Sequence, residues 1–67
     1  MPQVSQEYVE GIKEGREWLT KYPSQDPAEM IEHLKRTKKG YASNSPVGQM
    51  LLGEIDFWKN QQKKAKV

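Results

Sequence analysis

One segment of this chain is far more apolar than the rest, and that contrast limits what the chain can fold into. Residues 44–58 read NSPVGQMLLGEIDFW, whereas the whole chain of 67 residues has a mean hydropathy of −0.99. A chain of this length buries only about 60% of the surface that it exposes when unfolded, so it supports one small core. We therefore expect a single domain over residues 1–62, organised around this segment, with residues 63–67 as a frayed basic tail.

Capping residues and prolines mark where helices begin. Asp26 precedes Pro27 and Ser45 precedes Pro46, and Ser5 is a similar candidate near the N-terminus. The side-chain oxygen of such a residue accepts a backbone N–H of the first helical turn, and proline suits the first helical position. The sequence therefore predicts an all-α domain with three helices, over residues 5–22, 26–39 and 45–62.

Helical spacing predicts how these helices pack. One stripe of the third helix holds Val47, Leu51, Ile55 and Trp58, which fall at i, i+4, i+8 and i+11. We expect this helix to be the central element and to contact both of the others. Their own apolar faces hold Tyr8, Ile12, Leu19 and Tyr22 in the first helix, and Met30, Ile31 and Leu34 in the second.

The third helix is also apolar beside this stripe. Met50 and Phe57 flank it, so its apolar arc is wider than the roughly 100° that packing on one side requires. The surplus indicates either a lopsided core or an interface with a partner or a second copy of the chain. Because interface cores are rich in aromatic residues and methionine, we predict as anchors Trp18, Met50, Phe57 and Trp58.

Two glycines interrupt the first helix, four residues apart. Gly11 and Gly15 each cost about 1 kcal/mol of helix stability relative to alanine. They fit a close approach by another helix, and they equally fit a helix of moderate stability that tolerates them. The sequence leaves both readings open.

Charge is divided unevenly along the chain. Residues 1–33 carry three basic and seven acidic side chains, a net charge of −4, while residues 34–67 carry eight basic and two acidic ones, a net charge of +6. Such asymmetry fits a nucleic-acid partner, packing of one half on the other, or self-assembly of the acidic first helix on the basic half of another copy. For nucleic acid, the candidate contacts are Lys35, Arg36, Lys38, Lys39 and Tyr41.

The chain lacks the residues that most catalytic and metal sites need. It has no cysteine, and His33 is its single histidine, whereas zinc sites usually need three or four nitrogen or sulfur ligands. No motif links a serine to His33, and no glycine-rich phosphate loop occurs. We therefore expect a protein that is not an enzyme, with no catalytic residues, no cofactor and no metal.

Neither a membrane span nor a signal peptide is expected. No apolar run approaches the 18 or so residues of a transmembrane helix, and residues 1–11, MPQVSQEYVEG, lack the basic and apolar regions of a signal sequence. We expect a cytoplasmic protein that does not act at a membrane.

Residues 40–61, with the motifs SPVGQML and DFWKNQ, resemble the C-terminal half of short uncharacterised proteins of tailed bacteriophages and prophages. The resemblance covers about a third of the chain and implies no catalytic residue. It implies a bacterial cytosol and a regulatory role in which a small protein binds a larger one of host or phage. The leading hypothesis is therefore a non-enzymatic interaction protein, and the alternative is a nucleic-acid-binding accessory protein.

Overall fold

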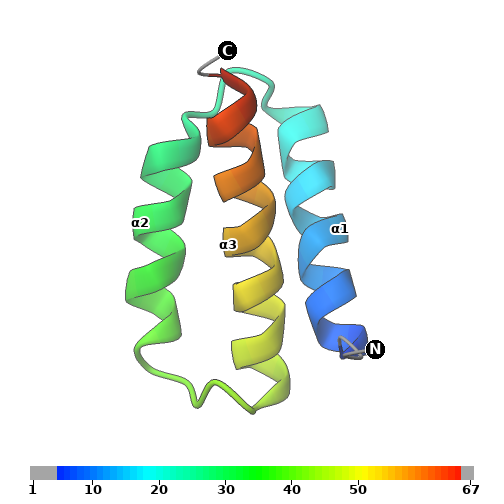
Figure 1. Cartoon of the computed structure of the whole chain (residues 1–67), viewed down its shortest axis with the longest axis vertical. Coiled ribbons are helices and arrows are strands. Elements are labelled where there is room, and N and C mark those ends of the chain that lie inside the picture. The colour runs from blue at the N-terminus through cyan, green and yellow to red at the C-terminus, as the bar shows by residue number, and fades with distance from the viewer. Residues whose placement is uncertain (1–4, 66–67) are drawn as a thin grey trace.

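The computed structural model describes residues 5–65, which form three helices joined by two short connections (Figure 1). The helices are α1 (Gln6–Lys21), α2 (Pro27–Lys38) and α3 (Pro46–Ala65). Residues 5–65 contain no strand, so the predicted all-α, three-helix fold is confirmed. None of these helices is both long and apolar enough to cross a membrane.

Each predicted capping residue caps its helix. The Ser5 hydroxyl oxygen accepts the Tyr8 backbone N–H at 3.1 Å, and the Asp26 carboxylate accepts that of Ala28 at 3.2 Å. Ser45 accepts the Gly48 backbone N–H at 3.1 Å. These bonds satisfy donors that a first helical turn leaves without a partner, which is why local sequence was enough to locate all three helix starts.

The end of α3 lies beyond its predicted position. The helix continues to Ala65, into the segment that we expected to fray, and residues 1–4 and 66–67 lie outside the described part of the chain. Glutamine, lysine and alanine have high helix propensity, and Lys63 and Lys64 carry positive charge where the helix dipole favours it. These two local preferences favour continuation of the helix.

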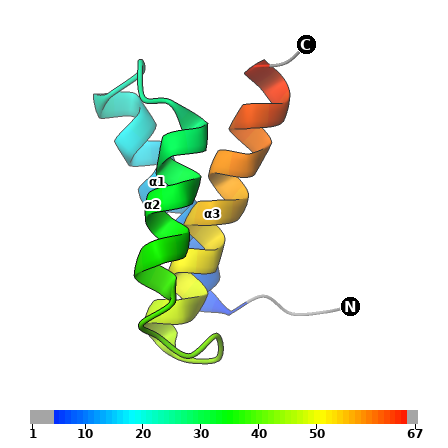
Figure 2. The ribbon, with the colours of Figure 1, turned by 90° about the vertical axis from the view of Figure 1, so that its left-hand side faces the viewer.

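α3 is the central helix, as predicted. Both α1 and α2 pack against it, and within the described residues no pair of Cα atoms closer than 8 Å joins α1 to α2. Figures 1 and 2 show α3 between the other two and set to one side of both. The fold is therefore two helices resting on a third, without close backbone contact between the two.

Side chains make the contact between α2 and α3. Ile31 and Leu34 of α2 are buried together with Leu51, Ile55 and Trp58 of α3. Trp58 has no exposed surface, and its indole N–H has no hydrogen-bond partner among the described residues. Trp58 therefore contributes through its volume at the centre of the core.

Glycines make much of the contact between α1 and α3. The Met50 carbonyl oxygen occupies the space that a Cβ at Gly11 would need, and the Tyr8 carbonyl oxygen does the same at Gly53. Glycine is the residue that lets two backbones approach so closely. Farther along, Gly15 lies under the Phe57 ring, where an added Cβ would be 2.7 Å from Cδ2. The close-approach reading of Gly11 and Gly15 is confirmed.

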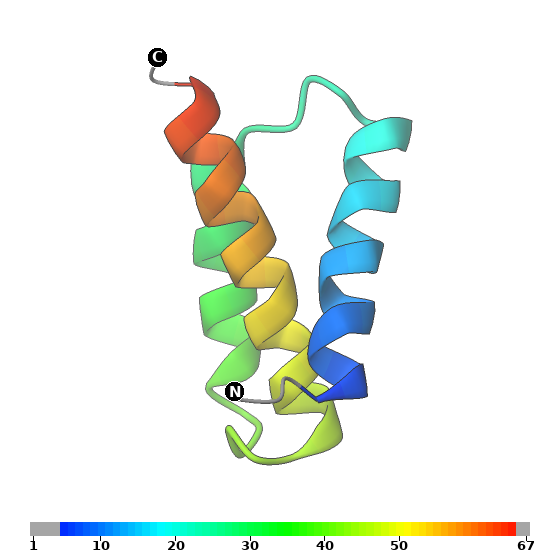
Figure 3. The ribbon, with the colours of Figure 1, turned by 45° about the vertical axis from the view of Figure 1, so that its right-hand side comes forward.

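α1 and α3 meet at one end and diverge toward the other. Figure 3 shows them close together near the start of α1 and apart near its end, with the Gly11 and Gly53 contacts in the close part. Tyr22, at the open end, is 50% exposed, so its predicted place in the core is wrong. Val47 is also wrong as a core residue, at 43% exposed. At the next position, Gly48, the Ala42 carbonyl oxygen of the preceding turn packs against α3.

Candidate interaction site

The four predicted anchors differ in exposure. Phe57 and Trp58 are 9% and 0% exposed and belong to the core, so their burial argues against direct contact with a partner. Met50 is partly buried and has α1 packed over its carbonyl. Trp18, at 42% exposed, is the one anchor of the four that presents a large surface to solvent. Of the surplus apolar residues of α3, Phe57 is therefore used inside the molecule, and Met50 is only partly buried.

Neighbouring side chains hold Trp18 in place. Its indole N–H donates a hydrogen bond to the Gln25 side-chain oxygen at 3.3 Å. The Tyr22 ring lies one helical turn farther along α1, with the two ring centroids 4.7 Å apart and the planes at 45°. An aromatic side chain held in this way loses less conformational entropy on binding than a mobile one.

Trp18 lines a pocket of about 300 Å³ to which all three helices contribute. Its lining comes from α1 and α2, with Glu54 from α3, and we call this hollow between α1 and α2 the groove. The pocket itself we call the acidic pocket, and its lining residues are Glu14, Trp18, Met30, His33, Leu34 and Glu54. Its apolar wall comes from an indole, a thioether and a leucine, and two carboxylates supply its charge.

The carboxylate of Glu54 is in an unfavourable environment. Burial raises the pKa of Glu54 above its ordinary value, and repulsion from the Glu14 carboxylate raises it further. Both causes act on the ionised form, because burial removes its hydration and a second anion repels it. A cation in the acidic pocket would relieve both.

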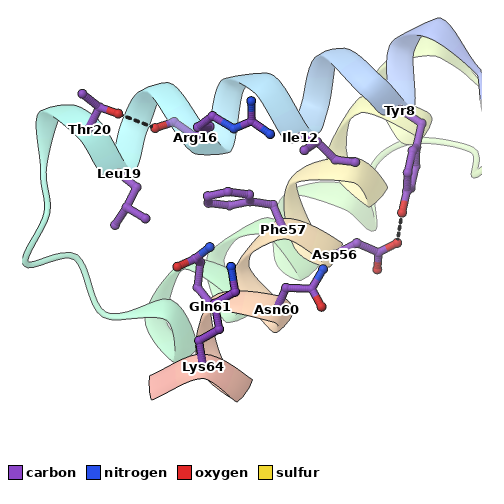
Figure 4. Close-up of a pocket in the computed structure, with 10 residues that line it drawn as sticks. All are labelled: Tyr8, Ile12, Arg16, Leu19, Thr20, Asp56, Phe57, Asn60, Gln61 and Lys64. Atoms are coloured by element: carbon purple, nitrogen blue, oxygen red, sulfur yellow. Dashed lines mark hydrogen bonds between the residues drawn. The ribbon is translucent and has the colours of Figure 1, made fainter. Parts of the chain in front are cut away.

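A second hollow of about 370 Å³ opens where α1 and α3 diverge (Figure 4). Ile12, Leu19 and Phe57 give it apolar surface, and Arg16 and Lys64 also line it. Its polar and apolar groups are mixed, and its charges are of both signs.

At one side of this hollow the Tyr8 hydroxyl donates a hydrogen bond to the Asp56 carboxylate, which links α1 to α3. That bond raises the pKa of Tyr8, and partial burial and the negative charge of Asp56 raise it further. Asp56 is therefore engaged within the fold, so this hollow gives a weaker indication of a ligand than the acidic pocket does.

The predicted nucleic-acid residues lie at the end of α2 and in the turn after it. Tyr41 is 49% exposed, but two of the four cations are engaged within the fold. The Arg36 guanidinium pairs with Glu32 at 3.0 Å, and the Lys38 ammonium donates to the Ser43 hydroxyl at 3.1 Å. At about 100° per residue, the four cations fall within an arc of about 160° at the end of α2 and its C-cap, and they are Lys35, Arg36, Lys38 and Lys39.

The charge asymmetry of the sequence is not used in ion pairs between helices. In the part of the chain that the structure describes, the ion pair between Arg36 and Glu32 is the only one, and it lies within α2. Packing of the acidic half on the basic half therefore does not rest on ion pairs. Self-assembly through these charges stays a prediction, and it requires oligomers that dissociate at high ionic strength.

Sequence reasoning named Trp18 but did not find the pocket beside it. Glu14 and Trp18 are four residues apart and share a face of α1, which was the one local signal. Glu54 and Leu34 lie on other helices, so only the packed structure brings them to Trp18. Comparisons of the chain with protein-family models, with characterised proteins and with solved structures find no match.

Proposed function

We propose that this protein is a non-enzymatic interaction protein that binds another protein through the groove between α1 and α2, with Trp18 as the anchor. The observation that carries the proposal is that Trp18 is 42% exposed and yet held by Gln25 and Tyr22. An ordered, exposed tryptophan beside a pocket is typical of binding hot spots, where a large side chain is buried at little entropic cost.

The resemblance of residues 40–61 to phage and prophage proteins supports a bacterial partner, and we propose a phage or prophage origin on that ground. Bacterial lysate is therefore the material in which to search for the partner. The purified full chain is coupled to a resin and exposed to bacterial lysate that has been treated with nuclease. We expect at least one protein to be retained, because the proposed partner is a protein.

Two matched variants show which side of α1 binds the retained protein. Trp18→Ala removes the anchor, and Val9→Ala changes a similarly exposed apolar residue, 50% exposed, on the opposite side of α1. The two positions are nine residues apart, which is about two and a half turns, so they face opposite sides of the helix. We expect Trp18→Ala to abolish retention and Val9→Ala to preserve it. Retention that is equal in the two variants would contradict the proposal.

One observation favours the second candidate, a nucleic-acid-binding accessory protein. Tyr41 is 49% exposed next to the cations at the end of α2, where its ring is available for stacking on a base. Binding through phosphates weakens steeply as salt concentration rises. Affinity for single-stranded DNA or RNA that falls with salt and is lost in Tyr41→Ala would support this candidate, and binding that is absent at low salt would exclude it.

A further inference from the structure

No lysine or arginine lines the acidic pocket, and none lies one helical turn from either of its glutamates. The residues three and four positions from Glu14 along α1 are Glu10, Gly11, Glu17 and Trp18, and none is basic. Those around Glu54 on α3 are Met50, Leu51, Phe57 and Trp58, and again none is basic. No ion pair to either glutamate occurs in the described residues.

The two glutamates belong to different helices, so the fold brings like charges into one small pocket. They repel each other there, and Glu54 is half-buried. Buried charges are normally paired, because removing an ion from water is costly unless an opposite charge compensates. The one other titratable group that faces this pocket is His33 of α2, which is exposed.

The wall of the pocket suits an aliphatic stem that ends in a flat cation. Trp18 contributes its indole to the wall, and a guanidinium stacks favourably on an indole, while Met30 and Leu34 offer apolar surface for methylene groups. Methionine adapts its shape to what it contacts. A guanidinium has five N–H donors in a planar fork, so it can donate to two carboxylates that reach it from different helices.

We propose that the acidic pocket binds the side chain of an arginine that the protein partner presents, with the guanidinium between Glu14 and Glu54 and against the Trp18 indole. This inference rests on the proposed function, because it assigns chemistry to the partner of the same groove. A lysine side chain shares the charge but not the planar fork, so it binds more weakly.

The test uses the isotope-labelled full chain and three short peptides, followed by NMR at constant ionic strength. The peptides are capped tripeptides with glycine at both ends and arginine, lysine or citrulline in the middle. Citrulline keeps the shape of arginine and lacks its charge. We expect the arginine peptide to shift the Trp18 indole N–H signal and the backbone signals of Glu14, His33 and Glu54 saturably, in the millimolar range. The citrulline peptide should bind at least about ten-fold more weakly.

Glu54→Gln and Glu10→Gln are the matched variants. Each removes one negative charge, but Glu10 is an exposed residue of α1 that does not line the acidic pocket. We expect Glu54→Gln to weaken arginine binding at least about ten-fold and Glu10→Gln to change it less than about two-fold. Glu54→Gln removes an unfavourable charge and does not threaten folding, so loss of binding in that variant reports the pocket itself.

Three results would overturn the inference. These are equal binding of the citrulline and arginine peptides, unchanged binding in Glu54→Gln, and the absence of a saturable shift at Trp18 with any peptide. If they occur while Trp18→Ala still abolishes capture of a protein, the arginine assignment fails and the proposed function stands. If arginine binds as expected but Trp18→Ala captures the same proteins as the unaltered chain, the pocket is a cation site and the proposed function fails.

Discussion

α1 and α2 are both held by α3, but by opposite means. α2 buries two large side chains, Ile31 and Leu34, whereas the buried residues of α1 are two glycines. Apolar area removed from water stabilises α2, at about 25 cal/mol per Å². α1 approaches so closely that its backbone contacts the backbone of α3, while its own apolar side chains, Ile12 and Leu19, are only partly buried.

This difference shows how a polar chain can bring three helices together around a small core. A close backbone contact needs few apolar residues, but it allows no added atom where it forms. Trp18 lies on the same side of α1 as Gly11 and Gly15, seven and three residues farther along. It is 42% exposed, near the end of α1 that diverges from α3. The comparison predicts that α2 is sensitive to lost volume and α1 to added volume.

The largest effect is expected from removing volume on the α2 side. Leu34→Ala should lower the free energy of unfolding by about 2–5 kcal/mol, because it leaves a cavity beside buried neighbours. The same change in α1, Leu19→Ala, should cost about 1 kcal/mol, because Leu19 is only partly buried. Urea unfolding of both variants measures the difference. Equal losses would show that the two contacts are alike.

The next effect comes from adding one carbon at the backbone contact. In Gly11→Ala the Cβ would lie 2.9 Å from the Met50 carbonyl carbon and 3.0 Å from the Glu54 backbone nitrogen. Backbone atoms cannot move aside as a side chain can, so we expect a net loss of about 1–3 kcal/mol despite the higher helix propensity of alanine.

Gly40→Ala is the control for that substitution. An added Cβ there meets only the Thr37 carbonyl oxygen, at 3.7 Å, and the backbone is not in the left-handed region. Thermal unfolding should show Gly40→Ala at or slightly above the stability of the unaltered chain. A stabilised Gly11→Ala would instead mean that the close contact gives way easily.

A smaller loss is expected at Gly15, where a side chain replaces backbone as the obstacle. An added Cβ would lie 2.7 Å from the Phe57 ring, but the ring can rotate or shift. Strain and the gain in helix propensity, about 1 kcal/mol, should nearly cancel in Gly15→Ala. Thermal unfolding of Gly15→Ala and Gly11→Ala, measured side by side, ranks the two positions by the stability that each substitution costs. If Gly15→Ala proved the more damaging, the Phe57 ring would be as rigid as backbone.

The smallest effect on stability is expected from removing the charge of Glu54, which lines the acidic pocket. Because folding raises the pKa of Glu54, the folded state binds a proton more tightly than the unfolded state does, and ionisation of Glu54 disfavours folding. This unfavourable contribution appears as pH rises above the ordinary pKa of 4.5 and is complete once pH exceeds the raised value. Glu54→Gln should therefore be more stable at neutral pH by a few tenths of a kcal/mol, since the group is only half-buried.

The advantage of Glu54→Gln should disappear in acid, where Glu54 is protonated in both states. Urea unfolding at pH 7 and at about pH 3, more than one unit below the ordinary pKa of 4.5, measures it, with Glu10→Gln as the control for loss of one negative charge. A constant advantage at both pH values would mean that the effect does not arise from ionisation of Glu54.

The sequence by itself determined where the helices begin and which helix is central. A cap such as Asp26 acts on its own first turn, and the stripe of Leu51, Ile55 and Trp58 follows from helical geometry alone, so both could be read from neighbouring residues. The sequence left open whether Gly11 and Gly15 permit close packing, and whether Phe57 belongs to the core or to an interface.

The tertiary structure decided those two points, and it alone formed the acidic pocket. Phe57 is buried because Gly15 leaves room for its ring, and that pairing joins residues on two different helices. The acidic pocket likewise depends on α1, α2 and α3 each supplying part of its wall. Local patterns report the periodicity of one helix, whereas the distance and angle between helices depend on every side chain at the contact. For that reason the exposure of Trp18, and its place beside Glu54, came from the fold alone.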